Sequence, residues 1–460
     1  MTLPTHGREL ILAALRHQPL GAIPWVPFSG VHAGKLAGLD ATQSLTSADN
    51  LVRAFAAANR AYDPDGQPVA FDLQIEAEIL GCQLQWAEKS PPAVATHPLE
   101  AEARIPQRLP QAEDGRLPLI LDAMRTVKRE FGEHTALFGL VTGPFTLASH
   151  LRGTEIFMDS YDRPEYLREL LEFCASAAER VAGFYLQAGM DVIAIVDPVV
   201  SQVSPKHFRA FLSQPFTRLF RYIRQQGALS SFFVCGDASK NLEAMCETAP
   251  DGVAIDENIS MTAARAITEK FNITLEGNIP LTSRMLLGSQ ADNMKYVIDL
   301  LDSLGVQPGK APSNLIISPG CDMPYDTPAE NTVGVMQALR EPESARLMLA
   351  NYQAAEMDLS AVVLPDYAHL PRPLMEVFTL DSAACPACGY MLSAAQRAAA
   401  ELAGRVDMVE YKITVPENIA RMKKHGIQNL PSLLINGELK FSSLIPPNRE
   451  LIEALKAAGA

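Results

Sequence analysis

The sequence predicts an α/β protein made of two domains, a (β/α)8 barrel and a second, smaller α/β domain. With 460 residues the chain is too long for one typical hydrophobic core. Residues 20–320 alternate short β-rich runs with amphipathic helical stretches, which is typical of a parallel sheet covered by helices. Three prolines then fall between residues 364 and 373, where they interrupt any helix. We therefore expect the barrel over residues 1–345, a linker region over 346–373 and the second domain over 374–460.

Eight β-rich runs occur in the first part of the chain, the number that such a barrel needs. An open, doubly wound sheet is the alternative, but no Gly-x-Gly-x-x-Gly pattern follows an early run. Helix starts support the alternation. Thr327-Pro328-Ala329-Glu330, for example, combines an N-cap hydroxyl, a proline at the first helical position and the Glu of a capping box. The expected strands are residues 23–28, 70–73, 135–141, 191–196, 231–234, 252–255, 273–276 and 315–318.

The second domain follows a different order of elements. Asn436-Gly437 between two short β-rich runs is a strong signal for a two-residue hairpin turn. The resulting β-α-β-α-β-β-α order matches a thioredoxin-like fold. Its expected strands are residues 375–380, 407–412, 432–435 and 438–441, and its expected helices are residues 388–402, 416–424 and 448–458.

Composition excludes several classes of partner. Hydrophobic residues make up 48% and charged residues 20% of the chain, as in ordinary globular proteins. A net charge of −14 argues against nucleic acid and against anionic membranes as partners. No apolar run approaches the roughly 18 residues of a membrane span, and the first residues lack a signal-peptide core. Seven cysteines are too few for a disulfide-stapled secreted scaffold, so we expect a cytoplasmic protein.

Acidic groups and two thiols follow successive expected strands of the barrel. Because chemistry in such barrels lies at the carboxyl ends of the strands, we expect these groups to converge on one face. His32, which follows the first strand, either faces the pocket or caps a turn. Asp197 either binds substrate or holds a neighbouring loop by accepting backbone N–H bonds. The candidates are His32, Asp72, Glu76 and Asn278 for substrate binding, and Asp197, Cys235 and Cys321 for catalysis.

A set of motifs spread over roughly residues 5–340 resembles the uroporphyrinogen decarboxylase superfamily. The resemblance is greatest to its branch of corrinoid-dependent methyltransferases, which is similar to methylcobalamin:coenzyme M methyltransferase. Each motif alone is short, but together they are specific. The motifs are Phe71-Asp72-Leu73, Glu76-Ala77-Glu78, Thr142-Gly143-Pro144-Phe145, Asp197-Pro198, Ser204-Pro205, Gly277-Asn278 and Ser318-Pro319-Gly320-Cys321-Asp322-Met323-Pro324.

Arginine content distinguishes the branches of this superfamily. The decarboxylases resemble one another in an arginine-rich loop after the first strand, where guanidinium groups pair with substrate carboxylates. No arginine occurs here between Arg16 and Arg53. The resemblance therefore implies transfer of a methyl group between a corrinoid, held on a separate protein, and a small thiol or related acceptor. Two other functions stay open: a non-catalytic corrinoid or tetrapyrrole carrier or redox sensor, and a decarboxylase of another carboxylated substrate.

The methyltransferase branch also implies a zinc site, with a His-x-Cys-Gly motif and the cysteine of Ser-Pro-Gly-Cys. Cys235 and Cys321 match the two cysteine positions, but Phe233 occupies the histidine position and its ring cannot bind zinc. One alternative is a zinc ion held by the two thiolates and a carboxylate. The other is that metal binding is lost and both cysteines are small buried hydrophobic residues. Barrels of this superfamily often pair, so a homodimer is a further expectation.

Cys385-Pro386-Ala387-Cys388 joins an expected strand to an expected helix, a position where the helix N-terminus favours a thiolate. Further on, Asn429-Leu430-Pro431-Ser432 resembles the cis-proline loop of thioredoxin-like proteins. We expect Cys385 to attack, Cys388 to resolve the mixed disulfide and Pro431 to contact the substrate. A zinc knuckle and an inactive scaffold are the alternatives. Such a module would keep Cys235 and Cys321 reduced or would reduce a disulfide form of the acceptor, with a thiol-disulfide reductase as its partner.

Overall fold

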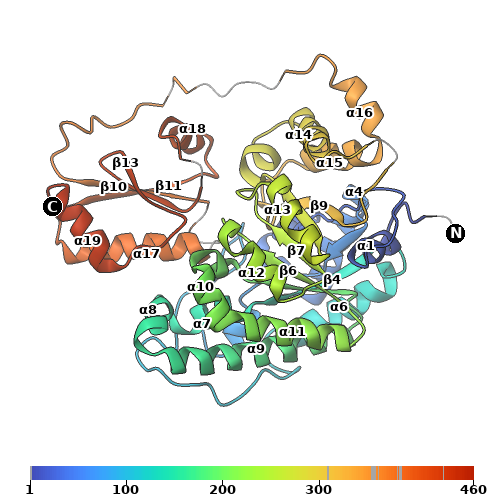
Figure 1. The fold of residues 1–460 in the computed structure, drawn as a ribbon, viewed down its shortest axis with the longest axis horizontal. Coiled ribbons are helices and arrows are strands. Elements are labelled where there is room, and N and C mark those ends of the chain that lie inside the picture. The colour runs from blue at the N-terminus through green and yellow to red at the C-terminus, as the bar shows by residue number, and fades with distance from the viewer. Residues whose placement is uncertain are drawn as a thin grey trace. The chain divides into compact units, whose positions relative to one another are not determined.

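The computed structural model describes residues 3–307, 310–353, 359–360, 362–380, 382, 386–427 and 429–460 (Figure 1). Contacts divide the chain into two compact units, Met1–Tyr352 and Gln353–Ala460. Both units consist of a sheet covered by helices, as the sequence predicts.

Seven parallel strands form the sheet of the first unit, and each pairs with the next in sequence order. The short strands β2 (Leu84–Gln85) and β3 (Ala93–Val94) pair separately. Five of the seven strands begin and end within two residues of the predicted runs, whereas β1 and β8 differ by more at one or both ends. In order, the seven strands are β1 (Gly66–Pro68), β4 (Ala136–Thr142), β5 (Val192–Val196), β6 (Leu229–Val234), β7 (Gly252–Ile255), β8 (Thr274–Ile279) and β9 (Leu315–Pro319).

Residues 24–26 close this sheet into a barrel. The backbone N–H of Val26 donates to the carbonyl of Ile317 in β9 (3.0 Å), and Asp65 N–H, just before β1, donates to the carbonyl of Trp25 (3.0 Å). The segment is thus bonded on both sides and takes the place of the eighth strand. The predicted (β/α)8 barrel is confirmed. The second predicted strand, residues 70–73, was wrong in position, because β1 ends at Pro68 and Phe71 already lies in the core beyond it.

Side chains of β6 show how the barrel is filled. Leu229 and Phe233 point into the interior core, whereas Phe232 points outward and stacks on Phe216 of α11 (Ser213–Gln225), with ring centroids 4.3 Å apart. This alternation is what a strand between a core and a helix layer requires. At the amino end of the strands, the buried apolar residues of α1 (Arg8–Leu15) belong to the same core and close that end of the barrel.

Helices surround the barrel on its outer side (Figure 1). The longest, α9, packs on α11 and α7. After α1, the helices of this unit are α2 (Gly30–Leu36), α3 (Ala41–Leu45), α4 (Ala48–Tyr62), α5 (Ile75–Ile79), α6 (Leu117–Phe131), α7 (Pro144–Arg152), α8 (Glu155–Asp162), α9 (Pro164–Gln187), α10 (Pro205–His207), α11 (Ser213–Gln225), α12 (Leu242–Glu247), α13 (Met261–Thr268), α14 (Gln290–Ser303), α15 (Ala329–Arg340) and α16 (Pro342–Met348).

The second unit has a four-stranded sheet in the order β11-β10-β12-β13. β10 runs parallel to β11 and antiparallel to β12, and β12 and β13 form the predicted hairpin. Asn436 and Gly437 both have positive φ angles (50° and 78°), as a two-residue hairpin turn of this kind requires. The elements are β10 (Leu374–Thr379), α17 (Pro386–Glu401), β11 (Asp407–Lys412), α18 (Pro416–Lys424), β12 (Ser432–Ile435), β13 (Glu438–Ser442) and α19 (Asn448–Ala457).

Part of the stretch before β10 packs on this second unit. Lys424 Nζ donates to the carbonyl of Val362 (2.6 Å), and the hydroxyl of Tyr367 lies 2.8 Å from Glu376 Oε2 and 3.1 Å from His425 Nε2. Val362 is buried and Glu376 is fully buried. These contacts make residues 362–367 part of the packed second unit.

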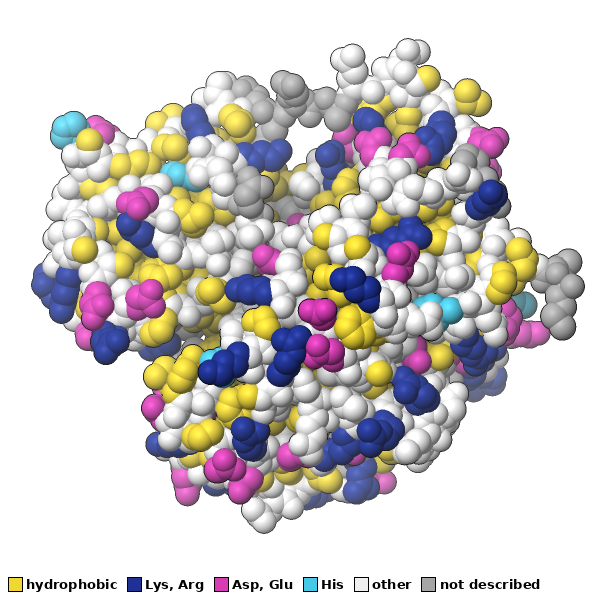
Figure 2. Space-filling model, viewed as in Figure 1, with side chains coloured by type: hydrophobic (Ala, Val, Ile, Leu, Met, Phe, Trp, Pro, Cys, Tyr) yellow, Lys and Arg dark blue, Asp and Glu magenta, His cyan; other side chains and the backbone are white. Residues whose placement is uncertain are grey.

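The surface carries both signs of charge. Figure 2 shows basic and acidic side chains interspersed over the visible face. Several basic side chains of the α11 region pair with acids, for example Arg218 with Glu179 (2.8 Å) and Arg209 with Glu247 (2.8 Å). Within the described ranges, no helix combines the length and apolar character that crossing a membrane requires.

Candidate functional site

The two barrel cysteines meet at the carboxyl end of the strands. Cys235 follows β6 and Cys321 follows β9, and the two form a disulfide with their Cα atoms 5.9 Å apart, a usual separation for such a bond. Both residues are half-buried. They pack against the interior core that contains Phe28 and Phe233. The disulfide therefore lies at the mouth of the barrel on a layer of aromatic rings.

This arrangement does not fit a zinc ion. Zinc is bound by thiolates, and the sulfurs of a disulfide carry no such charge. Phe233 offers only hydrocarbon, with its ring centroid 4.7 Å from that of Phe28 and 5.9 Å from that of Phe71. Among the described residues, no three His, Cys, Asp or Glu side chains are placed to hold a metal ion. The predicted pair of ligands, Cys235 and Cys321, is thus joined in a bond, and the residue at the expected histidine position is Phe233.

Asp197, directly after β5, is fully buried and contacts the first residues of α7. Its Oδ2 accepts from the backbone N–H of Phe145 (2.8 Å), and its Oδ1 accepts from Thr146 N–H (3.0 Å) and the Thr146 hydroxyl (2.6 Å). A side chain at Gly143 would collide with Asp197. Burial raises the pKa of Asp197 to about 7. These bonds match the second of the two predicted roles, in which the carboxyl group holds a neighbouring loop.

Asp72 and Glu76 fix the loop after β1. Asp72 forms a buried ion pair with Arg116, whose Nε also donates to Glu78 Oε2 (2.7 Å). Glu76 lies 2.8 Å from the hydroxyl of Thr142 at the end of β4 and accepts from Thr142 N–H (3.2 Å). Burial raises the pKa of Glu76 to about 7. Both carboxyl groups thus have partners within the chain.

His32 and Asn278 likewise bond to other loops. The two ring nitrogens of His32 lie 3.0 Å from the Tyr325 carbonyl and 2.6 Å from the Tyr62 hydroxyl. Burial lowers the pKa of His32 to about 4, so the ring is neutral near pH 7. Asn278 Nδ2 donates to the carbonyls of Asp256 (2.9 Å) and Ile259 (2.7 Å). The structure brings these predicted residues to the carboxyl end of the barrel, where they connect its loops.

A carboxyl group that the sequence interpretation missed lies beside the cysteine loops. Glu257 is half-buried and accepts from the backbone N–H of Leu281. Burial and the neighbouring Asp256 raise the pKa of Glu257 to about 8. A Cβ atom at Gly320 would lie 2.7 Å from Glu257 N, so the Ser-Pro-Gly-Cys loop packs directly on this residue. Its position in the sequence, next to Asp256 at the end of a predicted strand, could have identified Glu257 as a candidate site residue.

Two more acids border the disulfide. Asp256 Oδ2 accepts from the backbone N–H of Gly236, directly after Cys235 (2.8 Å). Asp322, directly after Cys321, lies against Gly30 at the start of α2, where any side chain would collide with the carboxyl group. Burial raises the pKa of both acids. The mouth therefore combines a disulfide with carboxyl groups that hold protons more tightly than usual.

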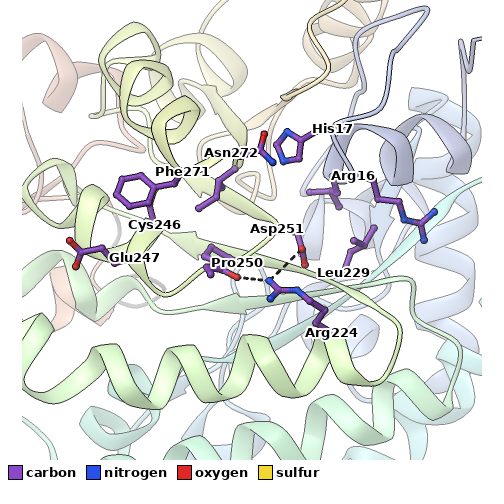
Figure 3. A pocket seen from close by; sticks show the side chains of 13 residues that line it. Arg16, His17, Arg224, Leu229, Cys246, Glu247, Pro250, Asp251, Phe271 and Asn272 are labelled. Atoms are coloured by element: carbon purple, nitrogen blue, oxygen red, sulfur yellow. Dashed lines mark hydrogen bonds and ion pairs between the residues drawn. The ribbon is translucent and has the colours of Figure 1, made fainter.

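A separate cleft of about 600 Å³ lies at the other end of the barrel (Figure 3). Leu229, Asp251 and Ile273, at the amino ends of β6, β7 and β8, line it. Arg224 fills part of it, with Nη2 donating to the Ala249 carbonyl (2.6 Å) and lying 3.6 Å from Asp251 Oδ1. Because barrel enzymes place their chemistry at the carboxyl ends of the strands, we do not assign the reaction to this cleft.

In the second unit, Cys388 is 1% exposed near the start of α17, and its Sγ accepts from the backbone N–H of Leu380 (3.4 Å). The Leu430–Pro431 peptide bond, before β12, is cis, as the predicted loop requires. Cys385 lies outside the described residues. The described part of the motif thus has the strand, helix and proline loop of the predicted redox site.

Comparisons with known proteins agree with this architecture. A family model described as uroporphyrinogen decarboxylase matches residues 6–342, and one described as a thioredoxin domain matches residues 375–456. The chain is 24% identical over 331 residues to methylcobamide:CoM methyltransferase MtbA of Methanosarcina acetivorans, covering 70% of this chain and 94% of MtbA. It is 29% identical over 278 residues to MtaA, a methylcobamide:CoM methyltransferase of Methanosarcina barkeri, covering 58% of this chain and 77% of MtaA.

Decarboxylases and a solved structure also match. The uroporphyrinogen decarboxylase of Gloeobacter violaceus is 24% identical over 297 residues, covering 62% of this chain and 83% of the decarboxylase. A solved methyltransferase from Methanosarcina mazei superposes with a TM-score of 0.65 at 22% identity, covering 74% of this chain and 99% of that structure. The chain therefore belongs to the uroporphyrinogen decarboxylase family and carries a thioredoxin domain at its C-terminal end.

Proposed function

We propose that the barrel transfers a methyl group between a corrinoid, held on a separate protein, and a small thiol or related acceptor. The observation that carries the proposal is the similarity to the MtbA methyltransferase, which extends over 94% of that protein's length. MtaA, to which the chain is also similar, is likewise a methylcobamide:CoM methyltransferase.

The loop after the first strand supports methyl transfer over decarboxylation. In the structure this loop forms α2, and its basic side chain Lys35 lies 3.4 Å from Asp326. Asp322 packs on Gly30 at the start of the same helix. The nearby guanidinium of Arg116 already pairs with Asp72 and Glu78. A substrate with several carboxylates would find few cationic partners among these groups, whereas a small thiol needs none.

The acceptor thiol must lose its proton before its sulfur attacks the methyl group. Glu257 is suited to accept this proton, because its pKa of about 8 is close to that of an ordinary thiol. Its backbone packs on Gly320, the residue before Cys321, and its carboxyl group accepts from the backbone N–H of Leu281. The corrinoid supplies or receives the methyl group, and the Phe28 and Phe233 rings provide an apolar floor that excludes water below the site.

The C-terminal unit, in this proposal, is a dithiol–disulfide module built on Cys385 and Cys388. The placement of Cys388 at the start of α17 and of Pro431 directly before β12 supports this role. Its external partner would be a thiol-disulfide reductase.

The test is demethylation of methylcobalamin by the fully reduced protein, followed by absorbance, with a panel of small thiols that includes coenzyme M. We expect turnover with at least one thiol. Glu257→Gln should lower the rate by about 100-fold, the usual size of a lost proton-transfer group. Glu102→Gln, which changes an exposed carboxylate, is the control. Absence of methyl transfer in both directions, with every thiol, would refute the proposal.

A further inference from the structure

The mouth of the barrel presents sulfur that a small molecule can reach. Cys235 and Cys321 are half-buried there, whereas the other cysteines of the barrel unit, Cys82, Cys174 and Cys246, are buried. Burial also raises the pKa of Cys82 and Cys246 to about 12, so these thiols stay protonated near pH 7. Exchange at sulfur requires that the attacking group can approach it. The thiol chemistry of the barrel unit is therefore expected at the mouth pair.

One loop holds both cysteines in place. The backbone N–H of the residue after Cys235 donates to Asp256 Oδ2 (2.8 Å), and Gly320, directly before Cys321, packs on the backbone of Glu257. Asp256 and Glu257 are consecutive residues that follow β7. Because these contacts do not pass through the sulfurs, the two thiols stay close together when the bond between them is open. Such a fixed pair closes again far more readily than two thiols on a flexible chain.

The zinc site that the family resemblance implies differs from this mouth at one position. Phe233 stands where a histidine is expected, and its ring packs on that of Phe28, with centroids 4.7 Å apart. The mouth thus keeps the two sulfurs and has hydrocarbon in place of the nitrogen donor. Two sulfurs without that donor can still open and close a disulfide, which needs no metal.

We propose that Cys235 and Cys321 form a dithiol–disulfide couple that exchanges with low-molecular-weight disulfides and thiols. The inference deepens the proposed function, and it rests on that function for one point, that the methyl acceptor is a thiol of this class. The disulfide form of the acceptor closes the Cys235–Cys321 bond, and the free acceptor thiol opens it. The mouth is then open where the acceptor is present in the form that methyl transfer requires.

Closure of the bond by a small disulfide, RSSR, balances as two exchange steps. One barrel thiolate attacks a sulfur of RSSR, the S–S bond of RSSR breaks, and the first RS⁻ leaves. The second barrel thiolate attacks the barrel sulfur of the mixed disulfide, which forms the Cys235–Cys321 bond and releases the second RS⁻. Each barrel thiol gives its proton to water, and each RS⁻ takes one up. Two electrons pass from the barrel to RSSR, and two RSH molecules reverse both steps.

The experiment uses the full-length protein with Cys385→Ser and Cys388→Ser, so that the C-terminal pair cannot react. The reduced protein, freed of reductant, is mixed with excess 2-hydroxyethyl disulfide, a small neutral probe that the carboxyl groups of the mouth do not repel. We expect release of about two molecules of 2-mercaptoethanol per chain, and non-reducing digestion with mass spectrometry should find Cys235 bonded to Cys321. Excess 2-mercaptoethanol should open the bond again.

Two further variants on the same background locate the reaction. Cys321→Ser should release about one molecule of 2-mercaptoethanol and keep a mixed disulfide on Cys235, because no second thiol displaces the probe. Cys246→Ser, which removes a buried thiol, is the matched control and should still release about two. In a fixed mixture of the probe and 2-mercaptoethanol, the ratio of closed to open pairs should be at least about tenfold higher in the folded protein than in urea.

Methyl transfer from methylcobalamin, measured on the same reduced protein, separates the two possible failures. If methyl transfer occurs but the pair stays reduced, stops at mixed disulfides or holds one zinc ion per chain, the inference alone is overturned. If the pair exchanges but no thiol accepts a methyl group, the exchange site stands and the proposed function is refuted. Equal ratios of closed to open pairs in the folded and unfolded protein would also overturn the inference, because the fold would then not hold the pair together.

Discussion

The ring of Phe233 packs on the ring of Phe28, with centroids 4.7 Å apart. Phe233 lies two residues before Cys235, and both side chains face the interior of the barrel. A ring nitrogen at this position would add a zinc donor beside the two cysteines. We expect reduced Phe233→His to bind about one zinc ion per chain and the reduced unchanged protein to bind far less. Metal content after gel filtration, measured by mass spectrometry, checks this.

The matched control for this zinc experiment is Phe233→His combined with Cys235→Ser, which should lose the metal again. Because the histidine replaces a buried phenylalanine, the variant will also be less stable, by a few kcal/mol. Its fold must therefore be verified by tryptophan fluorescence first. Stoichiometric zinc in the unchanged protein, lost on Cys235→Ser, would show that a donor other than residue 233 completes the site.

Glu276 in β8 is fully buried, and a hydrogen bond from Ser231 only partly offsets the effect of burial on its carboxyl group. Burial raises its pKa from the ordinary 4.5 to about 7. Between these values the unfolded chain has lost the proton and the folded chain keeps it, so stability falls as the pH rises from 4.5 to 7. Glu276→Gln should remove this loss and raise the free energy of unfolding near pH 8, by up to about 3 kcal/mol.

Urea denaturation near pH 5 and near pH 8 measures the effect of Glu276→Gln. Both tryptophans of the chain, Trp25 and Trp86, lie in the barrel unit, so their fluorescence reports its unfolding alone. Glu102→Gln serves as the exposed control. Equal gains at the two pH values would mean that packing, and not ionisation, makes the difference.

Local signals in the sequence predicted most of the fold. The run 252–255 became β7 with the same ends, and Asn436-Gly437 formed the predicted hairpin turn. Hydrophobic periodicity and turn residues depend on only a few neighbouring positions, so they predict an element without knowledge of its tertiary contacts. The second strand was misplaced because Phe71, apolar like a strand residue, is buried in the loop beyond β1.

The candidate site was predicted only in its location. Strand ends placed Cys235 and Cys321 on one face, but their bond depends on loops 86 residues apart. The partners of Asp72 and His32, which are Arg116 and Tyr325, lie 44 and 293 residues away in sequence. Such pairings depend on three-dimensional packing, which a single sequence does not encode in any local pattern.

Asp197 accepts the first free N–H groups of α7, and this contact predicts a structural cost for its removal. Asp197→Ala leaves the buried N–H groups of Phe145 and Thr146 without their acceptor, which should lower the free energy of unfolding by about 3 kcal/mol. Asp197→Asn keeps one oxygen and should cost less. Urea denaturation followed by tryptophan fluorescence measures both. A stable Asp197→Ala protein that cannot transfer methyl groups would instead place this carboxyl group in the reaction.

The hydroxyl of Tyr367 contacts Glu376 in β10, a fully buried carboxyl group. Burial raises the pKa of Glu376, and the bond from Tyr367 opposes that rise by stabilising the charge. Tyr367→Phe removes the bond, so the pKa of Glu376 should rise further and the C-terminal unit should lose about 1–2 kcal/mol near pH 8. Hydrogen exchange of the β10 and β12 amides in the full-length protein measures that loss.

Tyr352→Phe is the matched control for this exchange experiment, because the Tyr352 hydroxyl bonds to Ser289 in the barrel unit instead. It should leave exchange in β10 and β12 unchanged. Near pH 4 the carboxyl group of Glu376 is protonated in the folded protein, so the effect of Tyr367→Phe should shrink there. An effect of equal size at both pH values would mean that Tyr367 stabilises the unit through its ring, which lies against Gly437, and not through the charge of Glu376.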